Sequence, residues 1–209
     1  MVVIGVIAVL MVLLAPTIGS LSKSTGRRGA VSNLTSIIEH TRSLALSQSR
    51  NAYIAFVGEM PPNAPPAVAR DYAFRAFAVF QDTASGAARV QVTKWQKLPE
   101  GISFRAAPEV PAAGTPVGTS ITATTNTGKA FFPFAPLGAT ATLECRYIAF
   151  DSTGTIVEPP VAAPLRLVIF EGLVSADVEQ PTARDANEQP VRDEIQIGRY
   201  NGRARLVVR

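Results

Sequence analysis

Residues 1–21, MVVIGVIAVLMVLLAPTIGSL, form an apolar run without a charged side chain, and Lys23, Arg27 and Arg28 follow it directly. A helix that crosses the hydrocarbon core of a bilayer needs about 20 mainly apolar residues, often with basic residues at the interface. A secretory signal needs basic residues before the run and a small-residue cleavage site after it. The run therefore favours a membrane anchor over residues 1–22; the alternatives are an uncleaved signal and a buried core helix.

The next part of the chain changes from uniformly apolar to periodic. Apolar residues recur three and four positions apart, the spacing of one helix face: Val31, Leu34, Ile37, Ile38, Leu44 and Ala45. Polar residues, among them Glu39, His40 and Arg42, occupy the other side. The pattern predicts that residues 23–50 continue the first helix as an amphipathic helix whose apolar stripe lies on a sheet.

From Asn51 onward the apolar pattern alternates, which predicts short antiparallel strands. The expected strand segments are NAYIAFV, DYAFRAFAVF, ARVQVTKWQ, GISFRA, KAFFPF, RYIAFDSTGTIV, LRLVIFEGLV, EIQIG and RARLVVR. The proline-rich residues 58–69 are expected to be loop, and Asn201-Gly202 is the dipeptide preferred in two-residue type I′ hairpins. One long helix followed by a β domain over residues 51–209 is an α+β fold, with the helix packed on the antiparallel strands.

Composition and motifs argue against an enzyme. The net charge of +4 comes from 20 Lys and Arg against 16 Asp and Glu, a mild excess for a nucleic-acid binder. Cys145 is the single cysteine, which excludes an intramolecular disulfide and a cysteine-based metal cluster, and its strand-like surroundings predict a buried thiol. His40, the single histidine, has no acid and nucleophile beside it in the sequence. We expect no catalytic, metal or cofactor site.

The first segment resembles the conserved N-terminal helix of type IV pilin-like proteins, and Pro16 falls where that family carries a kink-forming proline. The rest is similar to minor pseudopilins of the H type and related minor pilins, at WQKLPEGISF (residues 95–104), Ile148, Phe150, Gly154, Ile195, Ile197, Gly202 and Arg203. The resemblance implies a structural subunit of a type II secretion or type IV pilus-like filament. It also implies a single-pass anchor in the bacterial inner membrane and a periplasmic domain.

In such a subunit the apolar helix exchanges lipid contacts for contacts with other pilin or pseudopilin subunits. The helix residues expected to make these contacts are Val2, Val3, Ile4, Ile7, Leu10, Leu13, Leu14 and Pro16. The family's basic leader, its processing glycine and the acidic residue near its mature start do not occur before this run. We expect the natural start to lie upstream, in which case a prepilin peptidase is a further partner.

Two other interpretations stay open at this point. Some relatives serve DNA uptake, and a C-terminal strand carries arginines that could bind phosphates, namely Arg199, Arg203, Arg205 and Arg209. The same arginines could line the wet face of an edge strand and discourage strand pairing there. The chain could also be a membrane-anchored periplasmic domain without a role in a filament.

Overall fold

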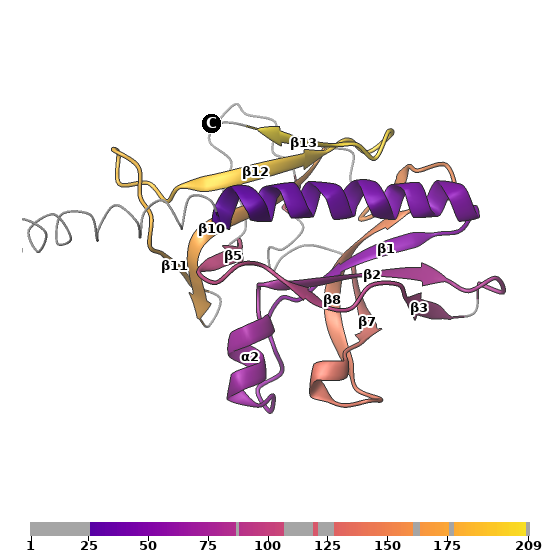
Figure 1. Ribbon diagram of the computed structural model, residues 1–209, viewed down its shortest axis with the longest axis horizontal. Helices are drawn as coiled ribbons and strands as arrows, with labels where there is room; N and C mark the ends of the chain where they lie inside the picture. Colours follow the sequence, from indigo (N-terminus) through magenta and orange to yellow (C-terminus); the bar gives the residue numbers. More distant parts are fainter. Residues whose placement is uncertain are drawn as a thin grey trace, which may run out of the picture.

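The computed structural model describes residues 26–86, 88–106, 119–120, 128–160, 164–175 and 178–207. The predicted membrane helix over residues 1–22, with Val2 to Pro16, and Arg209 lie outside the described residues. A single continuous helix occupies residues 26–48 and is called the N-terminal helix below. Figure 1 shows it in indigo, lying across the β strands.

The N-terminal helix buries the predicted apolar stripe. Leu34 and Ile38 are fully buried, and Val31, Ile37 and Ala45 are also in the core. Thr41 is buried beside them, and its hydroxyl donates a hydrogen bond to the carbonyl of Ile37 at 2.7 Å, which satisfies the polar group inside the core. The opposite side of the helix is exposed at Ser32, Asn33, Ser36, His40 and Ser43. An amphipathic helix is therefore confirmed over residues 26–48, whereas its continuation from the apolar run lies outside the described residues.

A first sheet lies under the helix, with the strand order β3-β2-β1-β8-β7. β4 also pairs with β2, and β9 pairs with β8. All of these pairs are antiparallel. The strands are β1 (Ala52–Phe56), β2 (Ala76–Asp82), β3 (Arg89–Gln91), β4 (Gln96–Lys97), β7 (Lys129–Pro133), β8 (Thr142–Phe150) and β9 (Ile156–Glu158).

A second sheet has the order β11-β10-β12-β13, with β5 and β6 also paired to β10. The β6 pairing is parallel and the others are antiparallel. The strands are β5 (Ile102–Phe104), β6 (Thr119–Ser120), β10 (Leu165–Ser175), β11 (Val178–Pro181), β12 (Arg192–Ile197) and β13 (Ala204–Val207). The predicted α+β class, a long helix packed on antiparallel strands, is confirmed in the described residues.

One hydrophobic core joins the N-terminal helix to both sheets. Its members from the first sheet include Ile54, Phe77 and Phe150, and those from the second include Leu167 and Ile195. Full burial of side chains of this size contributes roughly 1.5–3 kcal/mol each relative to exposure. The helix is therefore a structural part of the β domain from Ala30 to Ala45.

The other face of the first sheet holds a second core. There Ala55, Ala78 and Phe80 pack with residues of β7 and β8. The whole of β1 is buried because cores lie on both of its faces, which explains its uninterrupted apolar sequence AYIAF.

The helix α2 (Pro66–Tyr72) covers this second core and corrects the sequence-based expectation of a loop over residues 58–69. Proline is tolerated in the first helical turn, where its missing N–H has no intrahelical partner, so Pro65 and Pro66 begin the helix. The strand expected from residue 71 starts only at Ala76, because Tyr72 ends α2 and Phe74 has a φ of 52°.

The loop between β12 and β13 also differs from the expected two-residue type I′ turn. The N–H of Gly198 donates to the carbonyl of Arg203 at 3.0 Å, so residues 199–202 form a four-residue loop. Gly202 has a φ of 60°, whereas Asn201 lies outside the left-handed region that a type I′ turn requires at both positions. The Asn201 side chain instead accepts a hydrogen bond from the N–H of Arg203 at 3.1 Å.

Candidate interaction surfaces

The described residues present no arrangement typical of catalysis or metal binding. No group of three or more His, Cys, Asp or Glu side chains there could hold a metal ion. His40 is exposed on the polar side of the N-terminal helix. Cys145 is 1% exposed, and burial raises the pKa of its thiol, so the group stays protonated at neutral pH. The predicted burial of this thiol is confirmed.

None of the helices in the described residues combines the length and the apolar character of a membrane span.

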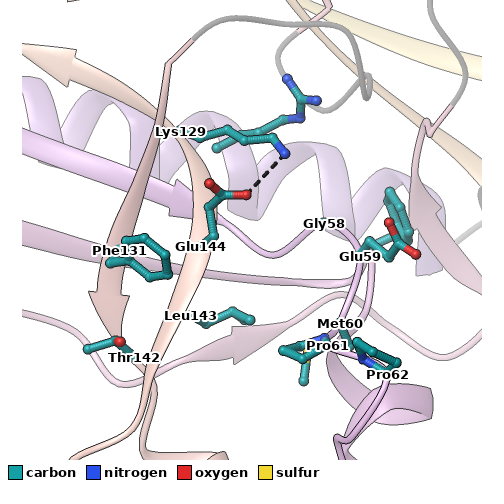
Figure 2. A pocket seen from close by; sticks show the side chains of 12 residues that line it. Gly58, Glu59, Met60, Pro61, Pro62, Lys129, Phe131, Thr142, Leu143 and Glu144 are labelled. Carbon is teal, nitrogen blue, oxygen red and sulfur yellow. Dashed lines mark hydrogen bonds and ion pairs between the residues drawn. The ribbon is translucent and has the colours of Figure 1, made fainter.

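A cavity of about 330 Å³ lies between the loop after β1 and the paired strands β7 and β8 (Figure 2). Its mouth carries Phe131, which is 67% exposed on the edge strand β7. Lys129 and Glu144 point toward each other across these strands and form an ion pair at 3.1 Å. Met60, Pro61 and Pro62 form the opposite wall. These residues offer a mixed surface with no nucleophile placed beside a base.

The predicted arginines near the C-terminus lie on a face of the second sheet that is only partly basic. Arg205 donates to the side-chain oxygen of Gln196 at 2.8 Å, and the amide nitrogen of Gln196 donates to Glu194 at 3.0 Å. Glu194 also pairs with Arg166 at 3.0 Å, and both side chains are less than 10% exposed. This face of the second sheet is therefore mixed in charge, and phosphate binding by these arginines stays a prediction.

The loop of residues 198–203, called the distal loop below, is held tightly against the rest of the fold. The carbonyl of Arg199 accepts from the N–H of Ile156 at 2.9 Å, and the N–H of Gly202 donates to the carbonyl of Gly198 at 2.7 Å. Just after the loop, the N–H of Ala204 donates to a Glu39 carboxylate oxygen of the N-terminal helix at 3.0 Å. The loop is thus fixed against the C-terminal half of the described helix, on the side where Figure 1 shows the β12–β13 hairpin turning.

The turn of residues 151–155 lies against the distal loop. The Asp151 carboxylate accepts hydrogen bonds from the N–H groups of Thr153 and Thr155, both at 2.9 Å. Burial alone would raise the pKa of Asp151, but the hydrogen bonds from Thr153 and Thr155 outweigh it and hold the pKa below its usual value. The turn is therefore stabilised by an ionised carboxylate at neutral pH.

Tyr200 is the residue of this loop that the sequence did not single out. It is 84% exposed, although the backbone around it is fixed. Arg203 is exposed in the same loop, while Arg199 is half-buried. The loop sequence GRYNGR places an aromatic residue between arginines, and this pattern could have identified Tyr200 from the sequence. The packing of the loop on Glu39 joins residues 165 positions apart and has no local sequence signature.

Comparisons with known proteins add the following. No family model and no curated protein sequence matches the chain. The structure of the type IV minor pilin FimU of Pseudomonas aeruginosa is similar over 87% of each chain, with 14% identity and a TM-score of 0.43. The minor pseudopilin EpsH of the type 2 secretion system of Vibrio cholerae is similar over 87% of this chain and 95% of its own, with 12% identity and a TM-score of 0.43.

Proposed function

We propose that the chain is a minor-pilin- or minor-pseudopilin-like structural subunit of a filament, anchored in the bacterial inner membrane before assembly. One observation carries the proposal: the N-terminal helix docks on the β domain by one face only, with core residues from Ala30 to Ala45. The apolar residues 1–21 lie four residues before this helix in the sequence. A helix that is fixed to a β domain and preceded in the sequence by an apolar segment suits a subunit that moves from lipid into a filament core.

The apolar segment supplies the two environments that this role needs. In the membrane, side chains such as Leu10 and Leu13 contact lipid. In a filament the same side chains contact neighbouring helices, and the small residues Gly5, Ala8 and Ala15 permit close approach. The β domain stays outside the membrane and offers the surface that distinguishes one subunit from another. The proposal covers a filament of a secretion system and a pilus alike, because the subunit plays the same structural role in both.

The mature N-terminus of the native protein tests the pilin-like processing that this proposal implies. We expect mass spectrometry of protein from membrane fractions to find a first peptide that begins upstream of Met1, follows a glycine and carries a methylated amino group. The measurement compares this peptide with the one that starts at Met1. A mature chain that begins at Met1 itself would contradict processing by a prepilin peptidase.

A further inference from the structure

We propose that the edge strand β7 binds an extended segment of another protein, which pairs with it as an additional strand of the first sheet. The inference goes beyond the proposed filament role and does not depend on it. Three observations carry it: the backbone groups that β7 turns away from the sheet, the exposed aromatic side chain at its centre, and its position away from the N-terminal helix.

The backbone of β7 presents hydrogen-bonding groups at the free edge of the sheet. β8 is its single strand partner within the described residues. The N–H of Phe134 donates to the carbonyl of Ala141, just before β8, at 2.8 Å. Because the bonding direction alternates along an antiparallel strand, the even-numbered residues of β7 bond to β8 and the odd-numbered ones point outward. Lys129 and Phe131 therefore turn an N–H and a C=O each toward the free edge.

Pro133 closes one end of this edge. Its backbone has no N–H, and its carbonyl accepts a hydrogen bond from Trp95 Nε1 at 3.1 Å. This bond comes from the side opposite to β8, which agrees with the outward direction of the odd-numbered residues. An added strand can thus pair with Lys129 and Phe131 and must end before Pro133. Each of these two residues can exchange a pair of hydrogen bonds with an antiparallel partner.

The side chain of Phe131 gives the free edge an apolar contact. It is 67% exposed, on the face that it shares with Lys129, whereas Phe132 on the other face is fully buried. Figure 2 shows Phe131 on this face, close to Glu144 of β8. Aromatic and β-branched residues that lie opposite each other stabilise paired strands. We therefore expect the partner segment to carry such a residue opposite Phe131.

The charged groups on the exposed face around Phe131 balance one another. Lys129 and Glu144 form an ion pair at 3.1 Å. Arg146, which is opposite Lys129 in the register, is 6% exposed, and Glu59 is exposed on the far wall of the cavity. The guanidinium group of Arg89 lies on the other face, over the aromatic rings of the second core. The centre of the partner segment is accordingly expected to be uncharged.

The edge of β7 differs from an edge that only resists pairing. Lysine and proline are residues that proteins place on edge strands to prevent aggregation. In β7 they stand at the two ends, and the exposed residue between them is an apolar one. The edge strand β13 of the second sheet is protected in another way, because the N–H of Ala204 donates to Glu39 of the N-terminal helix at 3.0 Å.

β7 lies where a partner can reach it while the N-terminal helix packs against other helices. Phe132 of β7 packs in the second core and not in the core that contains the helix. Figure 1 shows β7 apart from the helix and on the far side of the molecule from β12 and β13. An added strand would therefore extend the first sheet away from the helix.

The pairing is tested by hydrogen exchange of the full chain in mild detergent, measured at single amides. The probe is a short capped peptide of alternating valine and threonine, with a lysine and a glutamate at its ends. Methyl groups on alternate backbone nitrogens leave it one edge that can pair. We expect the peptide, at about 1 mM, to slow exchange of the Lys129 and Phe131 N–H groups about tenfold. Exchange at Ala130 and Phe132, which already donate to β8, should change little.

Two proline variants distinguish this edge from the opposite edge of the same sheet. Phe131→Pro removes an outward N–H of β7 without removing a bond to β8, and it should abolish the slowing at Lys129. Gln91→Pro removes the equivalent outward N–H from the edge strand β3, and it should leave the slowing unchanged. Phe131→Thr keeps the N–H, so it should weaken binding only several-fold. Fluorescence of Trp95 checks that each variant is folded.

The results that would overturn the inference are distinct. No slowing at Lys129 and Phe131 in the unsubstituted chain would mean that the edge does not accept a strand. Equal slowing at Ala130 and Phe132, or equal slowing by a peptide methylated at every backbone nitrogen, would show general stabilisation instead of pairing. Slowing that survives Phe131→Pro would also contradict it. None of these results affects the proposed filament role, because the probe involves no other subunit.

Discussion

Replacing Ile38 with alanine is expected to lower the free energy of unfolding by about 4 kcal/mol, which is near the upper end for removal of a buried aliphatic side chain. Ile38 is fully buried, in the core that the N-terminal helix shares with both sheets. The cavity left behind cannot collapse easily, because β strands support it from two directions. The measurement is urea unfolding of the full chain in mild detergent, followed by the fluorescence of Trp95, the single tryptophan.

Ser36→Ala is the matched control, because Ser36 is on the exposed side of the same helix. Its effect should stay within about 0.5 kcal/mol, since alanine is a good helix former and no buried contact is lost. Trp95 packs in the second core, at 5.8 Å from the Phe80 ring, so it reports unfolding of the sheet rather than local fraying of the helix. Equal effects of the two substitutions would show that the helix is not docked by this face.

Gly202→Ala is expected to lower the free energy of unfolding by about 3 kcal/mol, from backbone strain together with a steric clash. Gly202 has a φ of 60°, and a methyl group there would collide with the carbonyl oxygen of Gly154. The same methyl group would lie 2.8 Å from Arg42 Cδ and 3.0 Å from Phe150 Cε1. Gly202 is therefore closely surrounded by the turn at Gly154, by β8 and by the N-terminal helix.

Gly86→Ala separates the two causes. Gly86 has a similar φ of 68°, but a methyl group there meets no atom within 4 Å, so only the backbone cost of about 1 kcal/mol remains. Both variants are measured by the same urea unfolding. A loss at Gly202 no larger than the loss at Gly86 would mean that the distal loop is loosely packed against the rest of the fold.

Periodicity in the sequence was sufficient to predict the parts of the fold that rest on local pattern. The spacing of Leu34 and Ile38 identified the buried helix face, and alternation identified most strands, including β10 and β12. It failed for α2, where prolines indicated a loop although Pro65 and Pro66 stand at the helix start. Proline excludes the interior of a helix more strictly than its first turn.

The candidate surfaces were less predictable, because they depend on contacts between distant parts of the chain. The alternating arginines of the last strand marked Arg203 and Arg205 as candidates. The hydrogen bond from Arg205 to Gln196 depends on the register of β12 and β13, which the sequence does not show. A cavity of about 470 Å³ is lined by four separate segments, at residues 26, 99–102, 171–173 and 182. No local pattern indicates that such segments meet.

The most direct test of the filament role compares the full chain with a variant that lacks residues 1–21. Filaments are sheared from cells that express either form, and the amount of this chain in them is measured by quantitative mass spectrometry. Fluorescence of Trp95 checks that the variant keeps its fold. The account predicts that the full chain co-isolates with filaments and that the folded variant does not. Undiminished incorporation of the variant, or absence of the full chain from filaments, would contradict it.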